Sequence, residues 1–341
     1  MTKHDKKIDI LFIYWLGLSL ILVFSIIIVG GLTRLTDSGL SITEWELFTG
    51  ILPPLNNNDW VNYFNLYKKI PQFSLLNSDM TLQEFKVIFY WEYFHRILAR
   101  FIGLFFLIPL IYFYFSNKIR KDYLNYCFII FFLILLQGFI GWYMVKSGLT
   151  SDVTVSHYRL SIHLSIALLI ISVMFWLFLN FKNKTCKFFF DLSKKNLPFI
   201  ILFLLIFSQI VLGAFVSGLD AGKIYQTWPL MGNSYLPNDL ITKDINSFFK
   251  FDNHSLVQFY HRNLAYVVSL YVLVMSYLIL KKKDKKLYLP ICLLLIFLSL
   301  QVFLGIVTLL SGINIVLASS HQIGSVLLIF SAINLYYFQI K

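Results

Sequence analysis

The sequence contains few charged residues and few cysteines for its length. Of its 341 residues, 13% are Asp, Glu, Lys or Arg, whereas soluble domains are about a quarter charged, so a water-soluble enzyme is excluded. A hydrophobic content of 58% also excludes a disordered chain. The three cysteines, Cys127, Cys186 and Cys292, lie in or beside apolar runs and form no pair at metal-binding spacing, which excludes a disulfide framework.

Long apolar stretches without charged side chains run through the chain. A helix that crosses a bilayer needs about 20 mostly apolar residues. Stretches of this kind cover 10–33, 101–117 (with a less apolar extension back through 89–100), 123–145, 160–181, 196–219, 263–280 and 287–340. The last stretch is long enough for two helices with a turn at 311–314. The sequence therefore predicts an all-α integral membrane protein with eight transmembrane helices.

The formal net charge of +12 would suggest nucleic-acid binding in a soluble protein. Here 16 of the 29 lysines and arginines lie in four short segments that alternate with the apolar stretches, at 1–9, 116–122, 182–195 and 281–286. Lysine-rich loops of membrane proteins face the cytoplasm, so both termini are predicted to be cytoplasmic and no nucleic-acid partner is expected. The N-terminal apolar stretch is too long for a signal peptide, and a bacterial inner membrane is favoured.

The two halves of the chain resemble each other in order and spacing. The matched segments are 92–96 with 258–262, 136–141 with 300–305, 147–149 with 311–313, and 162–165 with 320–323. The first and fifth apolar stretches also both end in glycine-containing segments. Each half has four helices, so both halves run the same way through the membrane, as parallel repeats do. The predicted domains are four-helix bundles at 1–195 and 196–341, with long outer loops at 34–87 and 220–254.

The repeat places one histidine on each even-numbered helix, in the outer half of the bilayer: His95, His163, His261 and His321. Ionisable side chains inside a membrane are costly and usually functional. Two imidazoles that face each other across a bundle can bind haem iron axially. Zinc or copper is less natural, because carboxylate and thiolate ligands are scarce. The repeat pairs His95 with His163, and His261 with His321.

Arginines lie near these histidines, and the three other histidines, of which His4 lies in the basic N-terminal tail, are weaker candidates. Outward-facing guanidinium groups suit haem propionates, although they could instead extend to the membrane surface. The five arginines are Arg34, Arg96, Arg100, Arg159 and Arg262. His157 precedes His163 by six residues and faces another direction, so an interfacial or indirect role is expected. His254 is expected in a loop.

Glu92 distinguishes the first half from the second. It precedes His95 by three residues on one helix face, and its counterpart is Gln258. The carboxylate suggests that the first site moves protons, while the second holds a cofactor and passes electrons. A salt bridge from Glu92 to Arg96 or Lys86 is the structural alternative.

Several segments carry a family resemblance that covers nearly the whole chain. They are 30–41, Glu44-Trp45, Pro53-Pro54, 84–86, 92–96, 155–164, Ala221-Gly222, 228–231 and 257–263. In these segments the chain resembles the haem A synthases, membrane enzymes that oxidise a methyl group of haem O to a formyl group. The long outer loops are similar to those of the mitochondrial and alphaproteobacterial branch. The chain lacks the outer-loop cysteine pair of some bacterial members, and it has His157 where the family usually has Gln.

The resemblance implies a role in cytochrome oxidase assembly and a set of site residues. Haem O is the implied substrate, held by His95 and His163, with Glu92 as the essential carboxylate. Haem b is the implied cofactor, held by His261 and His321. The C8 methyl group would be oxidised twice, with water as the oxygen source, and would then lose water. Electrons would leave through haem b to an unidentified acceptor.

Two other functions are compatible with parts of the sequence. A two-haem membrane cytochrome b that only carries electrons explains the four histidines equally well. It does not explain the contrast between Glu92 and Gln258, or the segment 30–41. A repeat-based transporter would place polar groups near the midplane, whereas here they gather towards one side. The sequence leaves open a homo-oligomer and any contact with the synthase that makes haem O.

Overall fold

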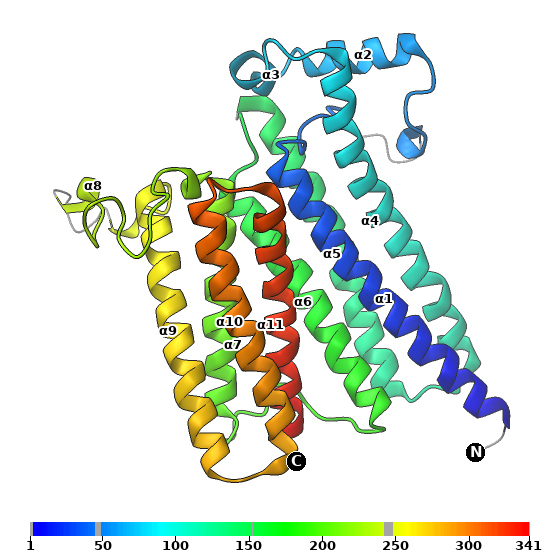
Figure 1. Cartoon of the computed structure of the whole chain (residues 1–341). Coiled ribbons are helices and arrows are strands. Elements are labelled where there is room, and N and C mark those ends of the chain that lie inside the picture. Colours follow the sequence, from blue (N-terminus) through cyan, green and yellow to red (C-terminus); the bar gives the residue numbers. More distant parts are fainter. Residues whose placement is uncertain (1–2, 45–48, 152, 242–247, 341) are drawn as a thin grey trace. The chain divides into compact units, whose positions relative to one another are not determined.

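A computed structural model describes residues 3–44, 49–151, 153–241 and 248–340, and all regular secondary structure in these ranges is helical (Figure 1). Eight helices are long and apolar enough to cross a membrane, which confirms the predicted number. The long helices are α1 (Lys3–Leu35), α4 (Leu82–Ser116), α5 (Lys121–Ser151), α6 (His157–Lys182), α7 (Leu197–Gly218), α9 (His254–Lys281), α10 (Tyr288–Leu310) and α11 (Ile315–Gln339). The short helices are η1 (Thr49–Ile51), α2 (Asn57–Tyr67), α3 (Pro71–Leu76), η2 (Ala221–Lys223), α8 (Asn238–Ile241) and η4 (Lys285–Leu287).

The chain forms two compact units, Met1–Ala167 and Leu168–Lys341, which divide inside α6. In the first unit α1 packs on α4, and α4 packs on α5. In the second unit α7 packs on α9, and α10 packs on α11 after the turn at 311–314 that the sequence predicts. The domain boundary predicted after residue 195 and the cytoplasmic placement of the termini stay predictions.

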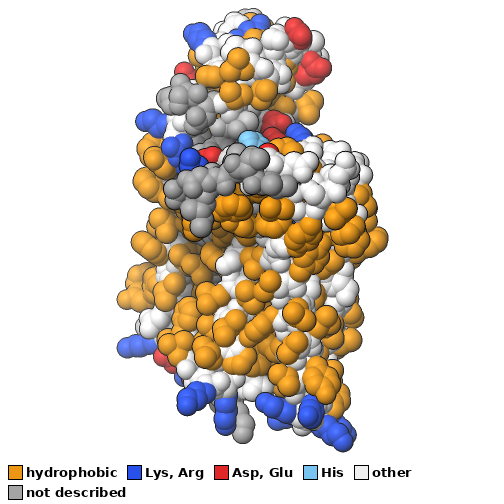
Figure 2. Space-filling model, turned by 90° about the vertical axis from the view of Figure 1, so that its left-hand side faces the viewer, with side chains coloured by type: hydrophobic (Ala, Val, Ile, Leu, Met, Phe, Trp, Pro, Cys, Tyr) orange, Lys and Arg blue, Asp and Glu red, His pale blue; other side chains and the backbone are white. Residues whose placement is uncertain are grey.

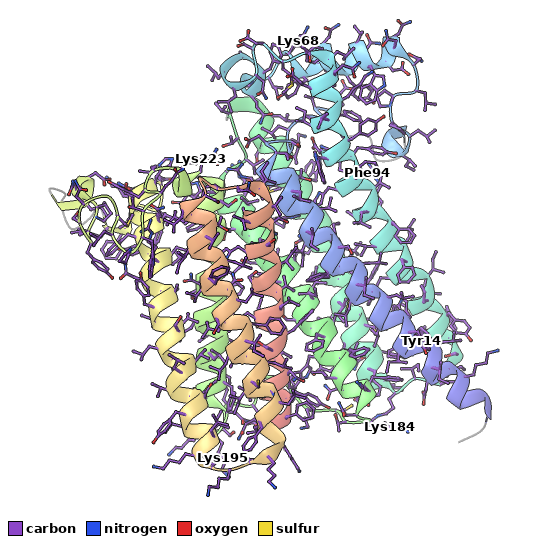
Figure 3. The ribbon with its side chains drawn as sticks, viewed as in Figure 1. Tyr14, Lys68, Phe94, Lys184, Lys195 and Lys223 are labelled. Carbon is purple, nitrogen blue, oxygen red and sulfur yellow. The ribbon has the colours of Figure 1, made fainter. Side chains whose placement is uncertain are left out.

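Hydrophobic side chains cover the walls of the helices on the face shown in Figure 2, whereas Lys and Arg side chains gather at the helix ends. Within the second unit, Lys184 and Lys195 lie at one end of the helices and Lys223 lies at the other (Figure 3). Apolar walls with charged ends are what a bilayer requires of a helix that crosses it. The chain is therefore a multi-pass membrane protein.

Two helices begin earlier than the apolar pattern predicts. Thr81 and Glu84 form a reciprocal capping box, so α4 begins at Leu82 and His95 lies thirteen residues into it. That is roughly 20 Å along the helix from its first residue. His254, expected in a loop, is instead the first residue of α9, because the Asn253 side chain accepts the Leu256 N–H and caps the helix. Both caps lie outside the apolar stretches.

The long segment between α1 and α4 is anchored by aromatic side chains. The aromatic, partly amphipathic sequence there forms α2, and Trp60 and Tyr67 of α2 lie against α4. Their ring centroids are 5.0 Å from Phe89 and 5.2 Å from Phe85, respectively. Burial raises the pKa of the Tyr67 hydroxyl, which donates a hydrogen bond to the Gln72 side chain at 3.1 Å. The segment is therefore fastened to the part of α4 that precedes His95.

A proline inside α4 is compensated by a tryptophan of α1. Pro109 has no N–H, so the carbonyl of Phe105, four residues earlier, loses its helical donor. The indole Nε1 of Trp15 donates to that carbonyl at 3.1 Å. The Trp15 ring also lies 4.7 Å from the ring of Phe106. This contact holds α1 and α4 together at the end of the unit where Tyr14 lies (Figure 3).

Candidate functional site

Each unit brings two histidine side chains together. In the first unit, His95 of α4 and His163 of α6 have ring centroids 6.4 Å apart, with their planes inclined at 67°. In the second unit, His261 of α9 and His321 of α11 have centroids 6.5 Å apart, with planes at 87°. The structure thus joins the same residues that the repeat pairs, and it does so twice with nearly equal separations.

In the first unit, each histidine ring lies against a glycine of a neighbouring helix. A Cβ atom at Gly30 of α1 would lie 3.1 Å from Nε2 of His95, and one at Gly141 of α5 would lie 2.9 Å from Cε1 of His163. Any larger residue would displace the ring. The sequence displays these glycines only as markers of the repeat, because the contact depends on how the helices are rotated against each other.

The second unit repeats this arrangement. A Cβ atom at Gly213 of α7 would lie 3.1 Å from Cε1 of His261, and one at Gly305 of α10 would lie 2.9 Å from Cε1 of His321. We call Gly30, Gly141, Gly213 and Gly305 the seat glycines. All four lie on odd-numbered membrane helices, counted along the chain. One glycine on each odd-numbered helix, opposite one histidine on each even-numbered helix, is the sequence pattern that could have predicted the contacts between them.

The two pairs have the donor set and the spacing of an axial imidazole site. A metal–imidazole bond of about 2.0–2.1 Å, with each ring centroid about 1 Å behind its nitrogen, places two opposed rings about 6 Å apart. The described residues contain no group of three or more His, Cys, Asp or Glu side chains that could hold a metal ion, so a zinc or copper cage is not supported. Haem iron, which takes two imidazoles, fits both pairs.

Unpaired buried polar atoms surround both pairs. Buried polar atoms almost always have hydrogen-bond partners, so a cluster of exceptions marks a place for a further group. The unpaired atoms include Nδ1 of His163 and His321, and Oε1 of Gln209 and Gln301, whose side chains contact the second pair. Oε1 of Gln137, one turn before Gly141 on α5, is also unpaired. In the sequence, Gln137 and Gln301 stand out only as members of the matched segments 136–141 and 300–305.

Glu92 is buried beside the first pair, with 3% of its side chain exposed. Its Oε2 accepts hydrogen bonds from the Ser41 hydroxyl at 2.7 Å and from the Ile42 N–H at 2.9 Å. Its Oε1 accepts from Nε and Nη2 of Arg96 at 3.1 and 2.5 Å. The predicted salt bridge to Arg96 is therefore confirmed, while Lys86 instead lies over the Trp60 ring. Four donors fix the Glu92 carboxylate between α4 and the segment that follows α1.

Gln258 and Arg262 occupy the matching positions of α9 and bind backbone carbonyls. The Gln258 amide donates to the carbonyl of Tyr225 at 2.9 Å. Arg262 donates to the same carbonyl at 2.8 Å and to the carbonyls of Thr227 and Leu230 at 2.8 and 3.2 Å. The second unit thus fastens its loop to α9 without a carboxylate.

The other predicted arginines have protein partners of their own. Arg34 pairs with Asp37 at 2.7 Å, and Arg100 donates to the carbonyl of Gly50 at 3.4 Å. The Arg159 guanidinium lies over the Tyr143 ring at 5.3 Å, and its buried Nη1 has no hydrogen-bond partner. Of these three arginines, Arg159 is the one with a buried donor left for a propionate.

The remaining sequence candidates lie at the margins of the sites. His157 is the first residue of α6, is buried and has its ring centroid 4.1 Å from that of Tyr158. Trp45 of the resemblance lies outside the described residues. Cys127, Cys186 and Cys292 are free thiols.

One family model and several known proteins match this chain over most of its length. The family model COX15-CtaA, described as cytochrome oxidase assembly protein, matches residues 13–333. The chain is 51% identical to the haem A synthase of Pelagibacter ubique over 325 residues, which cover 94% of this chain and 95% of that protein. It is 43% identical to the haem A synthase of Rickettsia bellii (92% and 94% covered) and 42% identical to that of Nitrosospira multiformis (94% and 90% covered).

Proposed function

The chain belongs to the COX15-CtaA family of cytochrome oxidase assembly proteins, among its haem A synthases, and from this membership we propose how it converts haem O to haem A. The substrate is proposed to bind between His95 and His163. The observation that carries this assignment is the pair of equal histidine sites of which one alone has a buried carboxylate, Glu92, at its side. The second pair, His261 and His321, is proposed to hold haem b.

The reaction is an oxidation of a CH group. The C8 methyl of haem O is oxidised in two steps of two electrons each, with water as the oxygen source. The resulting gem-diol loses water and leaves a formyl group. Four electrons and four protons are released for each haem A formed. When bound, haem b supplies a one-electron carrier through which the electrons leave for an acceptor.

The chain's own residues position the substrate and move protons. His95 and His163 hold the substrate iron, and the seat glycines let both rings approach it. Glu92 accepts protons released from the methyl carbon, a task suited to a carboxylate that lies three residues from a ligand on the same helix. Ser41 and Arg96 hold that carboxylate in place. Arg159 binds a propionate through its unpaired Nη1, and Arg34, Arg96, Arg100 and Arg262 supply further positive charge near the sites.

The setting is proposed to be a bacterial inner membrane with both termini in the cytoplasm. Lysine-rich loops alternate with the eight helices as this topology requires. The units are proposed to be parallel repeats of one four-helix bundle. Haem O, with its apolar tail, would enter from the lipid, supplied by the synthase that makes it.

A second candidate function is a two-haem electron carrier, because both pairs have nearly the same spacing. Haem extraction and chromatography of the purified protein, made in cells that also produce haem O, separate the two functions. We expect haem b together with haem O or haem A. The variant His95→Ala should lose haem O and haem A but keep haem b. Haem b alone in the unaltered chain would favour the carrier and overturn the assignment of the first site.

A further inference from the structure

The residue one helical turn before each seat glycine differs between the two units. These residues are Ile26, Gln137, Gln209 and Gln301, each four positions before Gly30, Gly141, Gly213 and Gly305. Residues four apart lie on one face of a helix, so each of them shares a face with a glycine that contacts a histidine ring. Both helices that supply seat glycines in the second unit carry an amide at this position. In the first unit α1 carries an isoleucine instead.

The two amides of the second unit contact its histidines directly. Nε2 of Gln209 lies 3.1 Å from Nδ1 of His261 and donates to the carbonyl of the same residue at 3.0 Å. Nε2 of Gln301 lies 3.4 Å from Nε2 of His321. Oε1 of both glutamines is buried without a hydrogen-bond partner. The amide oxygen and nitrogen are assigned from such networks, so either atom of the Gln301 amide can face the ring. Gln209 presents its oxygen to Nδ1 of His261 only when its amide turns over and gives up the bond to the His261 carbonyl.

The fit of Gln301 depends on another glycine. A Cβ atom at Gly324 of α11 would collide with Oε1 of Gln301. Gly324 lies one turn after His321, so the helix that carries the ring also leaves room for the amide beside it. Gly324 therefore leaves space for the Gln301 amide beside the His321 ring.

We propose that Gln209 and Gln301 are positioning residues that keep haem b permanently bound, and that Ile26 keeps the substrate site exchangeable. The inference rests on the proposed function, in which both histidine pairs hold haem. An imidazole that binds iron through one nitrogen must pair its other N–H, and a buried amide oxygen satisfies it. Such a partner fixes the ring and strengthens its bond to the metal, typically by 10–100-fold in affinity.

The difference matches the tasks of the two sites. A resident cofactor has to stay through every turnover, whereas the substrate has to leave as product. Isoleucine cannot accept a hydrogen bond, so α1 offers the His95 ring no amide partner at this position. The site whose ligand must exchange is thus the one with fewer amides.

The decisive test measures haem b rather than activity. Purified Gln209→Leu and Gln301→Leu proteins are mixed with apomyoglobin, and the transfer of haem b is followed by absorbance. We expect transfer 10–100-fold faster than from the unaltered chain. The haem b midpoint potential should become more positive, because a weaker imidazole donor stabilises ferric iron less. Gln301→Glu retains an acceptor and should retain haem b, which separates loss of the hydrogen bond from a failure to fold.

The converse test adds an amide to the first unit. Ile26→Gln should slow the transfer of haem O and haem A to apomyoglobin and leave more product on the enzyme. Leu22→Gln places the same amide one turn away on α1 and serves as the matched control, with no change in transfer. Unchanged haem b transfer and potential in Gln209→Leu and Gln301→Leu would overturn the inference. An unaltered chain without haem at the second pair would instead overturn the proposed function.

Discussion

In the first unit a carboxylate joins α4 to the segment after α1, whereas in the second unit an amide joins α9 to the loop after α7. The Glu92 carboxylate accepts hydrogen bonds from Ser41, Ile42 and Arg96. The Gln258 amide instead donates one to the carbonyl of Tyr225. Both side chains therefore fasten a loop to a helix just before a histidine. Only Glu92 carries a carboxylate, a group that can act as a general base. The comparison separates what the position does for the structure from what it does for the chemistry.

The strongest test gives the first unit the side chain of the second. Glu92→Gln keeps the shape of the side chain and part of its hydrogen bonding but removes the proton site. Haem A formation should fall by about 10²–10⁴-fold, the usual contribution of a general base. Bound haem should stay constant. The ratio of haem A to haem O in extracted pigment measures the effect.

The reciprocal variant Gln258→Glu is the control for Glu92→Gln. It places a carboxylate in the second unit and should give no gain in haem A. Full activity in Glu92→Gln would remove the carboxylate from the chemistry and leave it a structural role alone.

The seat glycines allow the two sites to be disabled one at a time. A Cβ atom at Gly305 or Gly141 would lie 2.9 Å from a histidine ring, and overpacking of this kind costs about 1–3 kcal/mol. Gly305→Ala should therefore lower the affinity for haem b about tenfold, and Gly141→Ala should lower the affinity for the substrate haem by a similar factor. The haem content of each purified variant gives the result.

Gly138 supplies the matched control for these alanine variants. It lies one turn before Gly141 on α5, and a Cβ atom there would meet nothing within 4 Å. Gly138→Ala should keep both haems. Loss of both haems from either seat variant would show that the two sites depend on each other.

A smaller effect is expected from the hydroxyl that holds Glu92. Ser41→Ala removes one donor of four from the carboxylate, and a hydrogen bond to a charged group contributes about 1.5–3 kcal/mol. Haem A formation should fall about tenfold, less than in Glu92→Gln, with both haems retained. Ser41→Thr keeps the hydroxyl and should restore most of the activity. Equal losses in Ser41→Ala and Ser41→Thr would point to packing rather than to the hydrogen bond.

The sequence predicts the helices and the histidine pairs because both depend on spacing along the chain. Apolar stretches mark the membrane helices, and the repeat identifies which histidines are equivalent. The early starts of α4 and α9 were missed because their caps, Thr81 and Asn253, lie in polar sequence. The contact between Ser41 and Glu92 was missed because it joins residues 51 positions apart. Contacts of this kind depend on the rotation of one helix against another, which a periodic pattern does not fix.

The smallest predicted effect concerns the proline that α4 has and α9 lacks, since Met275 stands at the matching position. Trp15→Phe leaves the Phe105 carbonyl without its indole donor and should lower the free energy of unfolding in detergent by about 1 kcal/mol. Adding Pro109→Ala restores the helical N–H to that carbonyl, so the double variant should lose less stability than the sum of the single changes. Thermal unfolding of the four proteins measures this coupling. If the losses in unfolding free energy of the two single variants add up to that of the double variant, the Trp15 indole contributes packing alone. The compensated proline is then not a functional difference between the first unit and the second.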